Sequence, residues 1–204
     1  MLEEMREMFD LNFDKMDGSI MAVVMCDGEV VDAGLMTCDN LDLSMRSNSI
    51  IFDPCRLICT YLCARVFVDC DRDALLFDVD LRSMSRDCVN FRKESISGFG
   101  KDGLIPAVVY DPRLRSVAMV DVVDLEALEL TRDTGKATFF SRTRHKPWVK
   151  GEASGNIIEV ASVTMNKRAD AVLYTSTIPR SVCHTGEMSC FTFDSELTTK
   201  FNSG

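Results

Sequence analysis

Short apolar runs separated by turn residues recur along the whole chain, and this pattern predicts strands rather than long helices. Asp27-Gly28 and Asp111-Pro112 are turn signals, each lying between two apolar segments. The strands expected in the first half are 19–26, 29–36, 48–52, 63–69, 73–79 and 88–92. Those expected in the second half are 104–110, 116–123, 137–142, 157–165, 170–177 and 190–194. The pattern therefore indicates a mainly β fold with short helices, in the α+β class.

One helix is well signalled, in the segment DLEALELTRDTG at 124–135. Asp124 is a good N-cap, Leu125 and Leu128 fall on one face, and Gly135 provides a stop. The matching region of the first half predicts a shortened version of this helix. Residues 1–9 predict a further short helix.

Similarity between the two halves of the sequence predicts an internal duplication. The segments ARVFVDCDRDALLFDVD (64–80) and ASVTMNKRADAVLYTST (161–177) align without a gap at an offset of 97 residues. Two further pairs of similar segments are 14–36 with 100–120, and 87–93 with 189–195. The alternative is a single all-β domain whose strands merely look alike.

The duplication implies a division of the chain into two strand-rich domains. With 93–103 as a linker, the expected domains are 1–97 and 98–204, packed against each other as a pseudo-dimer within one chain. Residues 1–97 contain 19 acidic and 10 basic side chains, whereas residues 98–204 contain 13 of each. The two domains are therefore expected to differ in role.

Composition narrows the functional classes. The 204 residues are 46% apolar, which is enough for one full-sized domain or two small ones, and the net charge of −9 argues against nucleic-acid binding. No apolar run approaches the ~20 residues needed to span a bilayer, and the N-terminal segment MLEEMREMFD lacks the features of a signal peptide. We therefore expect a cytoplasmic protein with no membrane partner.

The chain contains nine cysteines, which in the cytoplasm are expected to be free, metal-bound or catalytic. Cys55, Cys59 and Cys63 recur every four residues and are expected to be buried packing residues. The segment SVCHTGEMSCF (181–191) differs, because it places a histidine beside one of two cysteines. Two thiols and an imidazole resemble part of a metal site.

The segment FFSRTRHKPWVKGEASGN (139–156) combines four basic side chains with His145, Trp148 and a Gly/Ser turn. The basic residues are Arg142, Arg144, Lys146 and Lys150. Cationic groups neutralise phosphates, and an indole can stack on a flat ring, so the segment suits a nucleotide. The alternative is a solvated basic loop.

These motifs together resemble the phosphoribosyl-AMP cyclohydrolase family. DGLIPAVVYD, DLEALELTRDTGKATFFSRTRHKPWVKGEASGN and CHTGEMSCF occur in the family's order and spacing, over about residues 98–194. The first half resembles the family weakly, mainly through DCDRDALL at 69–76. The resemblance implies a hydrolase of histidine biosynthesis, acting on the cyclic amidine C–N bond between N1 and C6 of the adenine ring of 1-(5-phosphoribosyl)-AMP.

The resemblance also implies a zinc site made of three thiolates and a Mg²⁺ site made of aspartates. The zinc ligands would be Cys70, Cys183 and Cys190, and the Mg²⁺ ligands would be Asp69, Asp71 and Asp73. In the family these motifs come from two subunits, whereas here each half keeps what the other lacks. The second half has Asn166-Lys167-Arg168 where the aspartate motif is expected, and two cations there would repel a metal. The first half keeps only Cys88 of the second cysteine motif.

Residue roles follow from the same resemblance. His184 is expected to be a general base or proton shuttle, with support of the metal site as its alternative role. The residues expected to bind substrate are Arg142, Arg144, Lys146, Trp148, Lys150, Ser154, Gly155 and Asn156. Strand alternation would put the three aspartates on one face, where they would repel one another without a cation.

Departures from the family pattern leave other functions open. Met188 and Glu187 stand where the family often has an arginine, which would weaken one phosphate contact. A zinc hydrolase acting on another purine nucleotide and a catalytically inactive binding subunit are the alternatives. The intact set of three cysteines argues against the inactive subunit.

Overall fold

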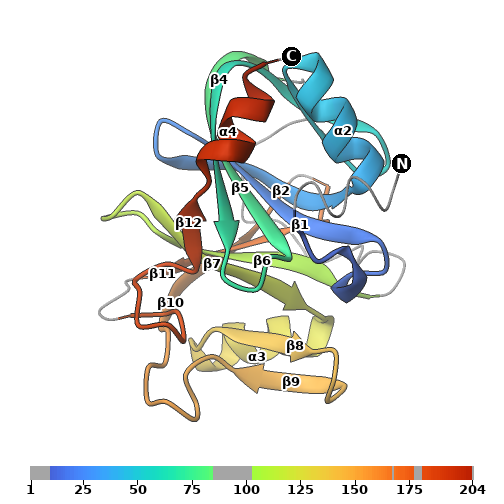
Figure 1. Ribbon diagram of the computed structural model, residues 1–204. Coiled ribbons are helices and arrows are strands. Elements are labelled where there is room, and N and C mark those ends of the chain that lie inside the picture. The colour runs from blue at the N-terminus through green and yellow to red at the C-terminus, as the bar shows by residue number, and fades with distance from the viewer. Residues whose placement is uncertain (1–9, 85–102, 167, 177–180, 204) are drawn as a thin grey trace. The chain divides into compact units, whose positions relative to one another are not determined.

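A computed structural model describes residues 10–84, 103–166, 168–176 and 181–203, and it confirms a mainly β fold with short helices (Figure 1). The described chain forms two compact units. Unit 1 contains residues 10–84 and 191–203, and unit 2 contains the described residues from 103 to 190. No helix in these ranges is long and apolar enough to cross a membrane.

Unit 1 is built on one sheet with the strand order β12-β4-β5-β1-β2, and β3 pairs with β4. Its elements are the 3-10 helix η1 (Phe13–Lys15), β1 (Ser19–Cys26), β2 (Glu29–Thr37), α2 (Cys38–Ser47), β3 (Ser49–Phe52), β4 (Arg56–Asp69), β5 (Ala74–Met84), β12 (Phe191–Phe193) and α4 (Ser195–Phe201). β1 lies between two strands and is nearly all apolar, as expected for a strand covered on both faces. The unit 1 core includes Phe13, Phe77 and Phe201.

Helix α2 corrects one prediction, because it is not shortened. Both α2 and α3 span ten residues. Thr37 and Asn40 form a capping box at the start of α2, and Asn48 ends it in the left-handed conformation at φ 47°. These polar caps replace the more obvious Asp and Gly signals of α3.

The last described residues pack in unit 1 although they follow unit 2 in sequence. In the antiparallel β12–β4 pair, Phe191 lies opposite Asp69. The Tyr61 hydroxyl donates a 2.9 Å hydrogen bond to the carbonyl of Phe201, whose side chain is fully buried. The compact units therefore differ from the sequence division at 97/98 by the segment 191–203.

Unit 2 has a four-stranded sheet in the order β10-β11-β6-β7 and a separate β8–β9 hairpin. Its elements are β6 (Ile105–Asp111), β7 (Ser116–Val123), α3 (Leu125–Thr134), β8 (Thr138–Ser141), β9 (Lys146–Val149), β10 (Val160–Met165) and β11 (Val172–Ser176). The predicted caps of α3 are confirmed: Asp124 accepts from the Ala127 amide, and Gly135 is left-handed at φ 67°. Phe139, Tyr174 and Leu128 belong to its core.

The two units share one topology and one register. The order β4-β5-β1-β2 in unit 1 has the same chain connections as β10-β11-β6-β7 in unit 2. Phe77 of β5 pairs with Val24 of β1, and Tyr174 of β11 pairs with Val109 of β6. A bulge follows each of these valines in the neighbouring antiparallel pair. The sequence alignment makes Phe77 equivalent to Tyr174 and Val24 equivalent to Val109, so equivalent residues form equivalent strand pairs in the two units.

The cysteines of β4 correct another prediction. Cys59 is fully buried, but Cys55 and Cys63 are exposed. Cys55 lies in the turn before β4, and irregular pairing around Tyr61 shifts the alternation, so Cys63 no longer shares a face with Cys59. The helix expected in 1–9, the strand expected at 88–92 and all but Gly103 of the expected linker lie outside the described residues.

Candidate active site

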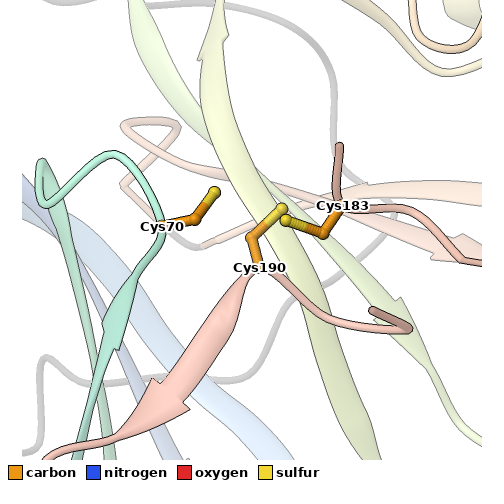
Figure 2. A group of neighbouring side chains, drawn as sticks. All are labelled: Cys70, Cys183 and Cys190. Carbon is orange, nitrogen blue, oxygen red and sulfur yellow. The ribbon is translucent and has the colours of Figure 1, made fainter. Parts of the chain in front are cut away.

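The loop between β11 and β12 brings two thiols together within unit 2. The sulfur atoms of Cys183 and Cys190 lie within 4.8 Å of one another (Figure 2). The amide of Cys183 donates to the carbonyl of Glu187, and Gly186, at φ 94°, closes a tight turn back to Cys183. The amide of Cys190 donates a 2.7 Å hydrogen bond to the carbonyl of Ala118 in β7. Backbone hydrogen bonds therefore hold both cysteines in this loop.

The turn between β4 and β5 brings together Asp69, Cys70 and Asp71 within unit 1, with one ligand atom of each within 4.8 Å of the others. One carboxylate oxygen of Asp69 accepts from the amides of Asp73 and Ala74, at 2.9 and 2.8 Å. The other accepts from the amide of Asp71 at 3.2 Å. Burial, together with the nearby charge of Asp73, raises the pKa of Asp69 to about 7. A cation at this turn would offset the repulsion between the carboxylates of Asp69 and Asp73.

The expected alternation of the three aspartates is wrong. Residues 70–73 form a turn rather than a strand, so Asp69 and Asp73 are buried whereas Asp71 is exposed. The carboxylate of Asp73 lies 3.0 Å from the Lys15 ammonium, and that of Asp71 lies 3.4 Å from it. The unit 1 turn therefore already contains one cation, supplied by its own chain.

The equivalent turn of unit 2 is held by an amide instead of a carboxylate. The side-chain oxygen of Asn166 accepts from the amides of Asp170 and Ala171, at 3.0 and 3.2 Å. Its side-chain nitrogen donates to the carboxylate of Asp170, which also pairs with Arg168 at 3.5 Å. Lys167 lies outside the described residues. The Asp170 carboxylate is thus paired with a cation, Arg168, and hydrogen-bonded to an amide, Asn166, both from its own turn.

A cavity of about 490 Å³ lies in unit 2, beside the thiol loop and the basic segment. Of the residues predicted to bind substrate, those on its wall are Arg144, Trp148, Lys150, Ser154 and Asn156. Cys183 and the exposed His184 line the same cavity. Among the described residues the wall does not include Arg142, Lys146 or Gly155. The cavity therefore combines a thiol, an imidazole and cationic groups in one space.

Aromatic contacts fix the indole of Trp148 at this cavity. The ring lies 5.7 Å from that of Phe139 in the unit 2 core, and the Lys150 ammonium lies 5.9 Å from the indole centroid. Glycine is required at 151, because its φ is 85° and a Cβ there would lie 2.0 Å from the carbonyl oxygen of Asn156. A flat, anionic ligand is the class that this wall suits best.

Sequence reasoning missed several residues of the wall, among them Glu152 and Ser181. Glu152 follows Gly151 inside the mainly basic segment 139–156, so its acidic side chain gives no separate signal. Ser181 precedes the cysteine motif and has no chemistry that would mark it. Both lie on the wall because the segment after β9 and the loop that carries Cys183 line the same cavity.

The donor chemistry fits two different kinds of metal. Paired thiols suit a soft or borderline ion such as zinc, and the carboxylates of the β4–β5 turn suit a hard ion such as Mg²⁺. Cys183 and Cys190 could supply two of the three protein ligands that a catalytic zinc site needs. Asp71 and Asp73 could supply oxygen ligands, although the Lys15 ammonium lies beside both carboxylates.

Comparisons with known proteins agree with the motifs. Residues 119–192 match the family model described as phosphoribosyl-AMP cyclohydrolase. The chain is 47% identical to the phosphoribosyl-AMP cyclohydrolase of Syntrophotalea carbinolica and 49% identical to that of Geotalea uraniireducens. Each match covers 90 residues, which are 44% of this chain and 72% of the relative.

A longer relative shows the same match over part of its length. The histidine biosynthesis bifunctional protein HisIE of Bacteroides thetaiotaomicron is 41% identical over 90 residues, which are 44% of each chain. The family-model match includes Cys183, His184 and Cys190 and the basic segment, and it excludes Cys70. On the extent and identity of these matches, the chain belongs to the phosphoribosyl-AMP cyclohydrolase family of enzymes.

Proposed function

We propose that this chain catalyses hydrolytic opening of the adenine ring of 1-(5-phosphoribosyl)-AMP, at the N1–C6 bond, in histidine biosynthesis. Membership of the family supports a hydrolase of this pathway. The observation that carries the proposal is the cavity of unit 2, where Cys183 and His184 lie on the same wall as Arg144, Trp148 and Lys150. That wall offers a site for a metal-activated water beside a site for a nucleotide.

Cys70 is the proposed third thiolate of the zinc site. Phe191 lies opposite Asp69 in the antiparallel β12–β4 pair. Cys190 directly precedes Phe191, and Cys70 directly follows Asp69, so extension of the same ladder by one position would make the two cysteines neighbours. This register supports a ligand set of Cys70, Cys183 and Cys190, with the fourth position open.

Zinc, when bound, supplies Lewis acidity that brings the pKa of a water molecule toward neutrality. His184 would accept a proton from the attacking water and return one to N1 as the bond to C6 breaks. Arg144 and Lys150 would bind phosphate, and Trp148 would stack on the purine. Arg142 and Lys146, which lie on the same basic segment, would bind the second phosphate, and Ser154, Gly155 and Asn156 would donate hydrogen bonds from the turn. Asp69, Asp71 and Asp73 would hold Mg²⁺.

The second part of the proposal is that the chain is a fused, duplicated dimer with one surviving site. The shared topology and register of the two units support duplication. The two aspartate-type turns have diverged, since Asp69 is matched by Asn166 and Asp71 by Arg168. A metal edge would then remain in unit 1 only, and the substrate cavity in unit 2. Each chain would form one site without a second copy.

The test is conversion of 1-(5-phosphoribosyl)-AMP by the purified, zinc-loaded chain, followed through the ultraviolet absorbance of the purine. We expect Cys70→Ser, Cys183→Ser and Cys190→Ser each to lose both bound zinc and activity, because three-ligand sites rarely survive loss of a thiolate. Cys63→Ser is the matched control, since Cys63 is an exposed cysteine of β4, and it should keep both. Full zinc content in Cys70→Ser would disprove the proposed ligand set.

Growth provides an independent readout. The chain should restore growth without histidine to a strain that lacks its own cyclohydrolase, and Cys183→Ser should not. A zinc-loaded chain that turns over another purine nucleotide and fails in this strain would instead support the alternative substrate.

A further inference from the structure

The Lys15 ammonium contacts two of the carboxylates, those of Asp71 and Asp73, that the proposed function assigns to Mg²⁺. We propose that Lys15 is an internal cation that occupies the acidic turn and must be displaced before a divalent metal can bind there. This inference rests on the proposed function only in taking Asp71 and Asp73 as metal ligands. It makes Lys15 a residue that sets metal affinity, rather than a catalytic residue.

The geometry is that of a cation held between two carboxylates. The Lys15 ammonium lies 3.0 Å from an oxygen of Asp73 and 3.4 Å from an oxygen of Asp71. The Asp73 side chain is only 7% exposed, whereas that of Asp71 is 58% exposed. A divalent ion binds carboxylate oxygens at about 2.0–2.6 Å, so it would meet the ammonium at the same oxygens. Two cations at that separation repel each other, and one must leave.

The fold holds the backbone of Lys15 near the turn but leaves its side chain a way out. Lys15 ends η1, which is anchored by the buried ring of Phe13. The amide of Asn12 donates a 2.7 Å hydrogen bond to the carbonyl of Arg72, within the acidic turn itself. The Lys15 side chain is 36% exposed, and its flexible stem can carry the ammonium into water without moving η1.

The equivalent turn of unit 2 shows the contrasting arrangement. There Arg168 occupies the position equivalent to Asp71, and its guanidinium pairs with Asp170 at 3.5 Å. That cation belongs to the turn, and it replaces a metal ligand. In unit 1 both carboxylates are retained, and the cation comes from a separate element. Unit 1 therefore keeps the ligands for a metal while neutralising them in its absence.

The first test is Mn²⁺ binding to the full, zinc-loaded chain, measured by electron paramagnetic resonance with Mn²⁺ as the probe for Mg²⁺. We expect Lys15→Met to lower the Kd for Mn²⁺ about five- to tenfold, because a competing charge is removed. Lys200→Met is the matched control, because Lys200 also lies in unit 1 and pairs with one carboxylate, that of Glu196, at 2.7 Å. Its Kd for Mn²⁺ should equal that of the wild type.

The second test uses the wild-type chain and does not depend on a variant that folds. Acetylation of lysines by an N-hydroxysuccinimide ester is measured by mass spectrometry with and without saturating Mg²⁺. We expect Mg²⁺ to raise the acetylation rate of Lys15 several-fold, because the ammonium is released into water, and to leave the rate of Lys200 unchanged. An unchanged Kd for Mn²⁺ in a folded Lys15→Met variant would overturn the inference. So would an acetylation rate of Lys15 that is the same with and without Mg²⁺.

These readouts separate the inference from the proposed function. A lower Kd for Mn²⁺ in Lys15→Met and faster acetylation of Lys15 with Mg²⁺, in a chain without ring-opening activity, would support metal competition at Lys15. They would also count against the cyclohydrolase assignment. An active chain with neither shift would support the enzyme and disprove the role of Lys15.

Discussion

Asp69 and Asn166 perform the same structural task in the two units. Each side-chain oxygen accepts hydrogen bonds from the amides four and five residues later, at 2.9 and 2.8 Å for Asp69 and at 3.0 and 3.2 Å for Asn166. The residue three positions after each has φ 58°. A carboxylate is therefore not required to build this turn, and the charge of Asp69 is available for another purpose.

Asp69→Asn should keep the fold, since the amide oxygen can accept the same two backbone bonds. Asp69→Ala should lower the free energy of unfolding by about 1–3 kcal/mol, because buried amides lose their acceptor. Urea unfolding in the presence of a chelator measures both. Asn166→Ala is the companion in unit 2 and should behave like Asp69→Ala. A loss of stability in Asp69→Asn as large as in Asp69→Ala would contradict the equivalence.

Mixing two inactive variants tests whether one chain forms its own site. Cys70→Ala and Cys183→Ala each lack one proposed zinc ligand, and neither could complete a site intramolecularly. We expect little activity after mixing them, and wild-type activity per chain that stays constant on dilution. Substantial recovery would indicate a swapped dimer, in which Cys70 of one copy serves Cys183 of another.

Phe201 should contribute strongly to the stability of unit 1, although it follows unit 2 in sequence. Its ring is fully buried and packs 5.0 Å from that of Phe77. Phe201→Ala should lower the free energy of unfolding by about 3–5 kcal/mol, as for other buried aromatics. Phe193→Ala, which removes a ring that is 50% exposed, is the control and should cost clearly less. Similar losses in the two variants would contradict the packing described for α4.

Alkylation of thiols tests the burial pattern of β4. Burial raises the pKa of Cys59 to about 12, so very little of this thiol is ionised at pH 8, and it is also shielded from reagent. The exposed Cys55 and Cys63 should react with iodoacetamide at that pH, whereas Cys59 should react only after urea is added. Modification is read peptide by peptide by mass spectrometry. Early modification of Cys59 would show that this part of the sheet opens.

Local signals predicted most of the fold. The strands 19–26 and 116–123 match β1 and β7, and helix α3 is capped by the predicted Asp124 and Gly135, because turn residues and caps act over a few positions. The exposure of Cys63 could not be predicted, since it depends on irregular pairing with a strand that is distant in sequence. The full length of α2 was not predicted, because its Thr37–Asn40 capping box is a weaker sequence pattern than the Asp124 and Gly135 caps of α3.

The candidate site was less predictable than the fold. The residues of the cavity wall came from motifs, and motifs mark reactive side chains but not neutral ones such as Ser181. Alternation predicts one shared face for the three aspartates, but residues 70–73 form a turn that separates Asp71 from the other two. The carboxylate of Asp69 accepts hydrogen bonds from the amides of Asp71 and Asp73 and so stabilises this turn. Lys15 carried no signal, because its contact with Asp73 joins segments 58 residues apart in sequence.

The position of β12 and α4 in unit 1 also affects the order in which the chain can fold as it is made. Domains usually fold as they emerge from the ribosome, starting with the N-terminal one. Here the edge of β4 that pairs with β12, and the core space filled by Phe201, stay incomplete until residues 191–203, which follow unit 2 in sequence, have been synthesised. Unit 1 begins before unit 2 and is completed after it, so a chain truncated before residue 191 would leave unit 1 without β12 and α4.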